Sequence, residues 1–214
     1  MCGFFASNSP KVNIEHLDII KNRIAFRGPD GESSLISHAG WKLYHARLAI
    51  IAPNSKYNQP YFTSDGSVIL FNGEILNFRT LAKKYGIHNQ DSDTHVLSKL
   101  LKNKSFKIDE LEGFYAFLRI DSAGKLTHCA RDKFGVKPLN FYKSKDNTIT
   151  ISSEASAIAD IFGMPYNKKA IEEYKVFRSP IFQGSFFTDI HSIKPGTCLI
   201  NGVFFDSLSC IPEQ

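Results

Sequence analysis

The sequence has 214 residues, of which 43% are hydrophobic and 22% charged, so it suits a globular domain, or a domain with an appendage, rather than a disordered chain. No apolar run approaches the ~20 residues of a membrane-spanning helix, so we expect no membrane partner. The first residues do not form a basic segment followed by an apolar one, as a secretory signal does, so we do not expect secretion. The net charge of +5 comes with scattered lysines, which predicts a solvated surface and no nucleic-acid partner.

The first half of the chain mixes strand-like and helical apolar patterns. In chain order they predict a strand over 3–7, a helix over 12–24, a loop over 27–31, a strand over 41–51, a loop over 52–66 and a strand over 67–71. The helix is expected to share one apolar face between Ile14, Leu17, Ile20 and Ile24. Polar residues at 45–47 interrupt the strand over 41–51, and Asn72-Gly73 is expected to be a turn.

The second half begins with helices and continues with hairpins. The patterns predict helices over 75–85 and 92–101, strands over 114–120, 125–131, 139–143 and 148–153, helices over 154–162 and 167–177, and short strands over 198–200 and 203–205. Gly86 is a plausible C-cap for the first of these helices. We therefore expect an α+β domain over residues 2–162 and a C-terminal appendage over 163–214.

The four cysteines are widely spaced and form no Cys-x-x-Cys pair; they are Cys2, Cys129, Cys198 and Cys210. We therefore expect no metal, no cofactor and no disulfide framework, and a reducing, cytoplasmic location. Cys2 differs from the others because removal of Met1 would leave it with a thiol and a free α-amino group. Such an amine titrates at about 7.7–8.0 and can accept the proton of its own thiol. The alternative is a structural cysteine at the start of a strand.

Polar clusters also occur within or next to apolar strands and helices, where the fold alone does not require polar residues. Arg47 lies in an apolar run, Asn72-Gly73-Glu74 follows a buried strand, and Asp93 lies in the first turn of a predicted helix. Taken singly, each has a simpler explanation. Arg47 could form a salt bridge at the rim, Asn72-Gly73 a plain turn, and Asp93 a favourable charge at a helix start.

These clusters belong to eight motifs that occur in the order of a known family: Met1-Cys2-Gly3, Arg27-Gly-Pro-Asp30, His45-Ala-Arg-Leu-Ala-Ile50, Gln59-Pro60, Asn72-Gly-Glu-Ile75, Ser92-Asp-Thr94, Glu112-Gly-Phe-Tyr-Ala-Phe117 and Ala130-Arg-Asp-Lys-Phe-Gly-Val-Lys-Pro-Leu139. The sequence resembles the class II glutamine amidotransferase domain, an N-terminal-nucleophile hydrolase, and in particular the glutaminase half of glutamine-hydrolysing asparagine synthetases. The resemblance implies a four-layer αββα sandwich of two antiparallel sheets. It also implies that residues 163–214 resemble the connector to a synthetase domain.

The resemblance implies a role for each site residue. Cys2 would attack the side-chain amide of L-glutamine and form a thioester, with Asn72 and the N–H of Gly73 as the oxyanion hole. Arg47 would hold the substrate α-carboxylate, and Asp93, helped by Glu74, the α-ammonium. The pocket wall would come from Leu48, Ala49, Ile50 and Ile51. Arg131 and Asp132 are expected to form an internal ion pair that supports the site.

The resemblance covers only half of an amidotransferase reaction. A synthetase domain of this family needs a Ser-Gly-Gly-x-Asp-Ser pyrophosphate loop, and the 214 residues contain no such run. We therefore expect a glutaminase subunit that supplies ammonia to a separate, ATP-dependent synthetase-like partner. Two alternatives remain: an N-terminal-cysteine amidase for another amide, and a non-catalytic regulatory or scaffolding module.

Overall fold

Two antiparallel sheets form the centre of the molecule. The computed structural model describes residues 1–182, 184–200 and, as backbone, 203–206. The first sheet has the order β11 (Ile190–Ser192), β9 (Asn140–Lys143), β10 (Ile149–Ser152), β1 (Gly3–Ser7), β4 (Trp41–Arg47) and β2 (Gly31–Glu32), with β3 (Ile36–His38) also paired to β4. The second has the order β13 (Val203–Asp206), β12 (Thr197–Ile200), β8 (Leu126–Arg131), β7 (Gly113–Ile120), β6 (Val68–Ile75) and β5 (Tyr61–Phe62).

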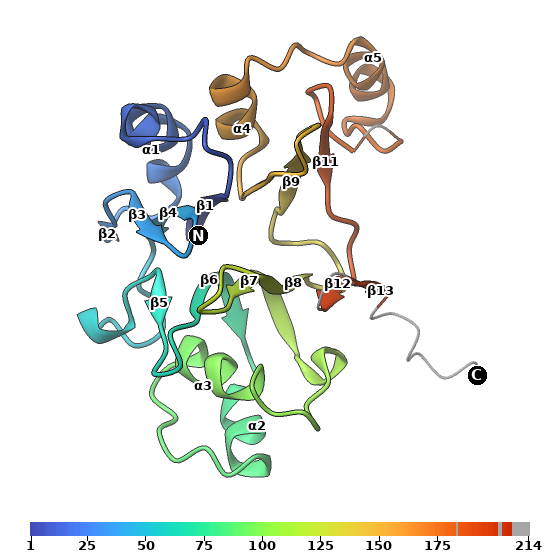
Figure 1. Cartoon of the computed structure of the whole chain (residues 1–214). Coiled ribbons are helices and arrows are strands. Elements are labelled where there is room, and N and C mark those ends of the chain that lie inside the picture. Colours follow the sequence, from blue (N-terminus) through green and yellow to red (C-terminus); the bar gives the residue numbers. More distant parts are fainter. Residues whose placement is uncertain (183, 201–202, 207–214) are drawn as a thin grey trace, which may run out of the picture.

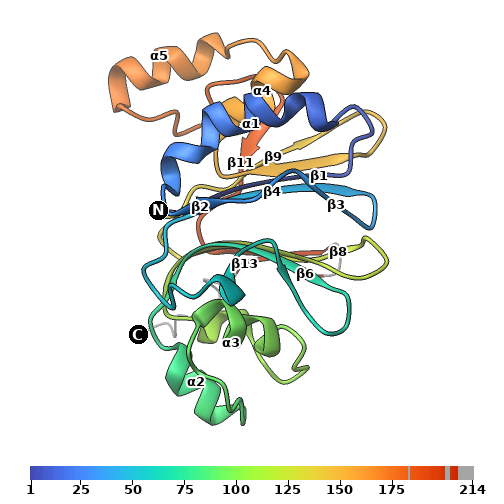
Figure 2. The same ribbon diagram turned by 90° about the vertical axis from the view of Figure 1, so that its left-hand side faces the viewer.

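Helices cover the outer face of each sheet. The first sheet carries α1 (Leu17–Ile24), α4 (Ala155–Phe162) and α5 (Lys168–Phe177), and the second carries α2 (Phe78–Lys84) and α3 (Asp93–Leu100). Figures 1 and 2 show the resulting order of helices, sheet, sheet and helices. Short 3-10 turns occupy Ile14–His16, Ala25–Arg27, Ser55–Tyr57 and Ile108–Glu110. The predicted α+β class and four-layer αββα sandwich are confirmed.

The apolar residues of each strand divide between two faces, as the two-residue period of a strand requires. In β1, Phe4 faces the core between the sheets, whereas Phe5 packs against the helix layer with Ile20 and Ile158. In β6, Leu70 faces the same inter-sheet core and Ile69 packs toward α2 and α3. Three buried layers therefore hold both sheets in place, and the ends of β1 and β6 are fixed relative to one another.

Several predicted boundaries are wrong in informative ways. Ile14 is 64% exposed in the 3-10 turn before α1, so the buried face of the helix begins later. The strand expected over 41–51 ends at Arg47, and its polar residues belong to β4 instead of interrupting it. Asn72-Gly73 is not a turn, because β6 continues through both residues to Ile75 and the helix starts only at Phe78. The strands β3 and β11 had no prediction, and β5 lies within the segment 52–66 that was expected to be a loop.

The segment after residue 162 contributes to both sheets. β11 pairs with β9 in the first sheet, and β12 pairs with β8 in the second. The boundary expected between 162 and 163 stays a prediction. Cys210 and the side chains of Phe204 and Phe205 lie outside the described residues.

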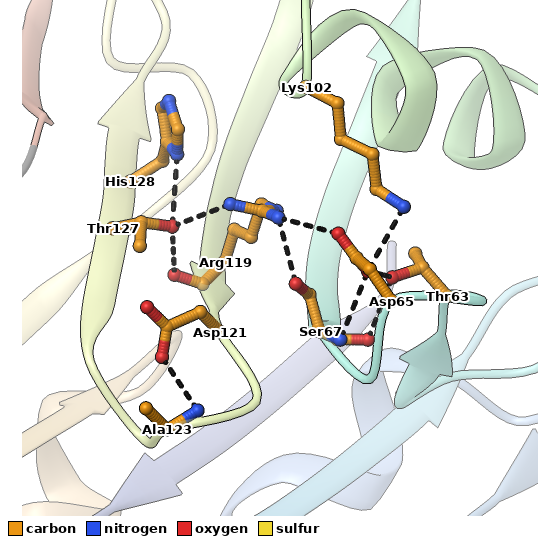
Figure 3. A network of polar contacts seen from close by, with 9 residues as sticks. All are labelled: Thr63, Asp65, Ser67, Lys102, Arg119, Asp121, Ala123, Thr127 and His128. Atoms are coloured by element: carbon orange, nitrogen blue, oxygen red, sulfur yellow. Dashed lines mark hydrogen bonds and ion pairs between the residues drawn. The ribbon is translucent and has the colours of Figure 1, made fainter.

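A network of polar contacts lies at the end of the second sheet that is away from the N-terminus. Figure 3 shows its residues from close by. On β7, Arg119 donates to Thr127 Oγ1 at 3.1 Å, to Ser67 Oγ at 2.8 Å and to Asp65 Oδ2 at 3.2 Å. Lys102, after α3, pairs with the same carboxylate at 3.0 Å. The network ties the hairpin between β5 and β6 to β7 and β8, and it has no contact with the candidate site.

Candidate active site

A small pocket, with a cavity volume of about 100 Å³, opens between the two sheets beside the start of β1. Every site residue expected from the sequence lines it, except Ala49. These residues are Cys2, Arg47, Leu48, Ile50, Ile51, Asn72, Gly73, Glu74 and Asp93. Ala49 lies beside them, where its N–H donates to Asp30 Oδ2 at 2.8 Å. Residues from both sheets, from the loop after β4 and from the start of α3 therefore meet around one cavity.

Cys2 precedes β1 and places its sulfur against the chain just after β4. The N–H of Leu48 donates to Cys2 Sγ at 3.3 Å, and the thiol donates to the carbonyl of Leu48 at 3.5 Å. Burial raises the pKa of the Cys2 thiol, and the Leu48 amide opposes that shift only in part. The sulfur is therefore held as a thiol at neutral pH, and a base must take its proton before it can react.

Arg27 fixes the backbone of Cys2 from the helix layer. Its Nε donates to the carbonyl of Cys2 at 3.0 Å, and its Nη1 pairs with Glu154 Oε1 at 2.5 Å. Arg27 is almost fully buried, so both contacts are screened from water. This residue belongs to the Arg27-Gly-Pro-Asp30 motif, and that motif was the signal that could have added it to the site.

Asn72 carries a polar side chain into an apolar face. Val68 and Leu70, four and two residues earlier in β6, point into the core between the sheets, so Asn72 continues the same face toward the first sheet. The side chain of Asn72 is fully buried, yet among the described residues neither its Oδ1 nor its Nδ2 has a hydrogen-bond partner. A buried unpaired amide costs about 1–3 kcal/mol, so a ligand group that pairs with it would be strongly favoured.

Gly73 presents its N–H to an open edge of β6. Along its length β6 pairs with β7, but β5 covers only Val68 and Ile69 on the other edge. On that edge the N–H of Phe71 donates to Gln59 Oε1 at 2.6 Å, and the N–H of Ile75 donates to Asp93 Oδ2 at 3.3 Å. Because the backbone groups of a strand alternate between its two edges, Gly73 directs its N–H between these two contacts and into the pocket.

Only glycine fits at position 73. Its φ is +148°, and a Cβ there would lie 2.0 Å from the carbonyl oxygen of Phe114 and 2.7 Å from the Cα of Tyr115. Both neighbours are backbone atoms of the paired strand β7, so neither can move aside cheaply. The close approach of β6 to β7 at this point therefore requires glycine.

Arg47 ends β4 with a nearly buried guanidinium group. Its Nη1 donates to Asn58 Oδ1 at 2.6 Å and to the carbonyl of Asn54 at 3.1 Å, and its Nη2 donates to the carbonyl of Ala52 at 2.5 Å. Guanidinium has five N–H donors, so two remain after these three contacts with the described residues. The loop after β4 therefore orients the guanidinium and leaves donors for a carboxylate.

Asp93 brings a carboxylate to the other side of the pocket. Ser92 caps α3 through its side chain, which places Asp93 in the first turn, where its oxygens accept from the N–H groups of Ile75 and Thr94. Burial raises the pKa of Asp93 to about 6, against the effect of these two amides, and Glu74 contributes in the same direction. The pocket is thus lined by two cationic side chains, Arg47 and Lys137, and by two carboxylates, Asp93 and Glu74.

The comparisons with known proteins agree with this arrangement. The sequence model of the family described as a glutamine amidotransferase domain matches residues 1–203. The chain belongs to this family. Its fold and the cysteine at position 2 place it among the class II glutamine amidotransferases, the enzymes that its motifs resemble.

The relatives of this amidotransferase domain include much longer proteins. Asparagine synthetase [glutamine-hydrolyzing] 2 of Arabidopsis thaliana is 33% identical over 168 residues, which cover 75% of this chain and 29% of that protein. Asparagine synthetase [glutamine-hydrolyzing] of Sandersonia aurantiaca is 36% identical over 172 residues, covering 75% and 32%. The solved glutamine phosphoribosylpyrophosphate amidotransferase from B. subtilis shares the fold, with a TM-score of 0.65 at 18% identity over 96% of this chain and 49% of that chain. The chain spans less than a third of the two synthetases.

Besides Met1, four residues that sequence reasoning missed line the pocket of this amidotransferase domain: Gln59, Phe71, Thr94 and Lys137. Gln59, Thr94 and Lys137 lie in motifs that carried the resemblance, so the signal was present. The expected ion pair between Arg131 and Asp132 is not formed. Arg131 instead donates to the carbonyls of Lys137, Gly135 and Ile193, and Asp132 accepts from the N–H groups of Phe134, Val136 and Lys137. Together these bonds shape the loop that carries Lys137.

Proposed function

We propose that this domain hydrolyses L-glutamine to glutamate and ammonia through a thioester on Cys2. The observation that carries the proposal is the buried side chain of Asn72, whose amide has no partner among the described residues and faces the pocket that holds Cys2. A donor held ready in a buried pocket stabilises an oxyanion as it forms. A non-catalytic module would gain nothing from keeping such a group unpaired.

The proposed reaction begins with removal of Met1, which frees the α-amino group of Cys2. That amine takes the thiol proton, and sulfur attacks the side-chain carbonyl carbon of glutamine. The carbonyl oxygen then becomes an oxyanion, which accepts hydrogen bonds from Asn72 Nδ2 and the N–H of Gly73. When the C–N bond breaks, the amine returns the proton to nitrogen and ammonia leaves. Water attacks the thioester, releases glutamate and restores the thiol.

Charge complementarity supports an amino acid as the substrate. Arg47 supplies hydrogen-bond donors for an α-carboxylate. Asp93, with Glu74 beside it, supplies negative charge for an α-ammonium group. A zwitterion satisfies both sides, whereas a simple amide would leave a buried charge unpaired, and leaving one charge unpaired costs several kcal/mol. An amidase for another amide is therefore the weaker proposal. The test is a panel of amides, with ammonia release expected from L-glutamine and far less from L-asparagine or acetamide.

Replacing Asn72 by alanine should lower the kcat for glutamine hydrolysis by about 10²–10³-fold, because one oxyanion donor is lost. The KM should change little, since Arg47 and Asp93 still hold the substrate. Steady-state ammonia release measures both parameters, and Asn103→Ala, on an exposed loop after α3, is the matched control. A large rise in KM with unchanged kcat would show that Asn72 binds the ground state and would remove it from the oxyanion hole.

We further propose that the ammonia passes to a separate ATP-dependent synthetase-like subunit in the cytoplasm. Support for a synthetase as the acceptor comes from the names of the relatives, which are glutamine-hydrolyzing asparagine synthetases. Free ammonia is mostly protonated in neutral water and is lost as a nucleophile, so coupling to an acceptor site is favoured. None of the helices in the described part of the chain is both long and apolar enough to cross a membrane.

The end of α5 and the turn after it are the proposed docking surface for that subunit. Val176, Phe177, Ile181 and Phe182 are 51–77% exposed there, and Phe177 and Phe182 contact each other edge to face. Phe186 and Phe187 do not belong to this surface, because their rings pack against Tyr174 and Tyr166. An apolar cluster of this kind on a charged surface favours a protein partner.

The double substitution Phe177→Ser and Phe182→Ser should leave basal glutaminase activity unchanged and abolish its stimulation by the synthetase subunit. Point substitutions are preferable to deletion, because β11 and β12 of the same segment belong to the two sheets. Ile14→Ser, another exposed apolar site, is the control. Glutaminase assays with and without the co-expressed candidate subunit measure both the basal activity and its stimulation. Full activity of the isolated chain, unchanged by any candidate, would refute the partner and leave a free-standing glutaminase.

A further inference from the structure

The side chain of Gln59 forms two hydrogen bonds with the backbone of Phe71. Its Oε1 accepts from the N–H of Phe71 at 2.6 Å, and its Nε2 donates to the carbonyl of Phe71 at 3.0 Å. Gln59 is 8% exposed, so water does not compete well for either contact. Phe71 immediately precedes Asn72, the proposed oxyanion donor.

The register of β5 explains why a side chain performs this task. β5 pairs Tyr61 with Ile69 and Phe62 with Val68, so the same antiparallel register continued by two residues places Gln59 opposite Phe71. Pro60 has no N–H to give to a ladder, and the paired strand begins only at Tyr61. A glutamine amide carries the same donor and acceptor as a peptide group. The side chain of Gln59 therefore takes the place of the missing strand residue.

Two more contacts define the same edge of β6. The carbonyl of Phe71 also faces His45 Nε2 at 3.2 Å, and burial lowers the pKa of His45 to about 4, so the neutral ring donates through Nε2. Four residues further along, Asp93 accepts the N–H of Ile75. The carbonyl of Phe71 thus has two donors, whereas its N–H has only Gln59 among the described residues. Loss of Gln59 would leave that N–H unpaired and the edge before Gly73 unsupported.

We propose that Gln59 is a positioning residue, which holds β6 at Phe71 so that Asn72 Nδ2 and the N–H of Gly73 converge on one oxyanion site. The inference rests on the proposed glutaminase activity. It goes further, because it assigns a role to a residue that need not touch the substrate. The role requires both hydrogen bonds between Gln59 and the backbone of Phe71. An apolar side chain of similar length would fill the same space but could not replace Gln59.

The test compares Gln59→Met, which fills similar space without either hydrogen bond, with Gln90→Met outside the site as the matched control. Displacement of the oxyanion donors should lower the kcat for L-glutamine by about 10- to 100-fold and change KM by less than about threefold. Alkylation of Cys2 by iodoacetamide, followed by the mass of the N-terminal peptide, should keep its rate. That reaction uses the thiolate but forms no oxyanion. If Gln59→Met does not fold, Gln59→Asn, whose amide is one methylene short, replaces it.

Each outcome decides the matter. A selective loss of kcat with unchanged alkylation supports the inference. Unchanged kcat in a folded variant overturns it, and so does an equal loss of kcat and of alkylation, which would mean that Gln59 only holds the pocket together. A rise in KM alone would make it a residue of substrate binding. Absence of glutaminase activity in the unaltered protein would refute the proposed function first, while the alkylation rate would still report on the pocket.

Discussion

Replacement of Cys2 by alanine should abolish glutamine hydrolysis and leave glutamine binding nearly unchanged. Cys2 is the only cysteine among the described residues that line the pocket, and loss of its thiol should lower the kcat by at least about 10⁴-fold, as removal of a covalent nucleophile does elsewhere. Binding should persist because Arg47 and Asp93 lie on β4 and α3 and do not depend on the sulfur. Ammonia release measures the first effect, and calorimetric titration with L-glutamine measures the second.

The control for this variant is Cys129→Ala. Cys129 is buried between the sheets, and burial raises its pKa to about 12, so it is an inert core residue and its replacement should preserve activity. Intact mass of the active protein should also show loss of Met1, because the proposed base is the α-amino group of Cys2. Full activity with Met1 retained, or substantial activity of Cys2→Ala, would contradict the N-terminal-nucleophile mechanism.

The residues of the candidate site could be predicted from the sequence because their types occur in a fixed order. Cys2, Arg47, Asn72 and Asp93 stand out as polar groups among apolar neighbours, and the motifs around them are long enough to identify a family. The layers of the fold followed from that identification. Period-two and helical patterns alone indicated only an α+β domain with hairpins.

The local backbone at the site could not be predicted, because it depends on contacts between distant segments. Asn72-Gly73 has the composition of a turn, yet pairing with Ala116 and Tyr115 of β7 keeps both residues in a strand. The position of Gln59 opposite Phe71 needs the register of β5, which only the folded sheet defines. Arg131 and Asp132 are adjacent and oppositely charged, but nearby backbone carbonyls and amides satisfy them separately.

The pKa of Asp93 links the stability of the domain to its function. Burial raises this pKa from 3.8 to about 6, so the folded state disfavours the ionised carboxylate. Stability from this group is therefore fully present below pH 3.8 and is lost as the pH rises through about 6. At neutral pH the free protein carries an ionised, partly desolvated carboxylate, which is the cost of a preformed cation site. A bound ammonium would offset this cost.

Asp93→Asn should weaken binding of L-glutamine by roughly 2–5 kcal/mol, the range for truncating one side of a desolvated charge pair. Turnover of glutaramate, the analogue without the α-amino group, should hardly change. In the unaltered protein the affinity for glutamine should fall as the pH drops below about 6, where the carboxylate becomes protonated, and the variant should lack this dependence.

Thermal unfolding at pH 7 separates this role of Asp93 from a structural one. The variant removes an ionised group that the folded state disfavours, and its single side-chain oxygen can still accept the N–H of Thr94 but not also that of Ile75, so the two effects oppose each other and its Tm should stay close to that of the unaltered protein. An exposed control, Asp18→Asn in the first turn of α1, should change neither affinity nor its pH dependence. Equal losses on glutamine and glutaramate, together with a lower Tm, would show instead that Asp93 serves α3 and the end of β6.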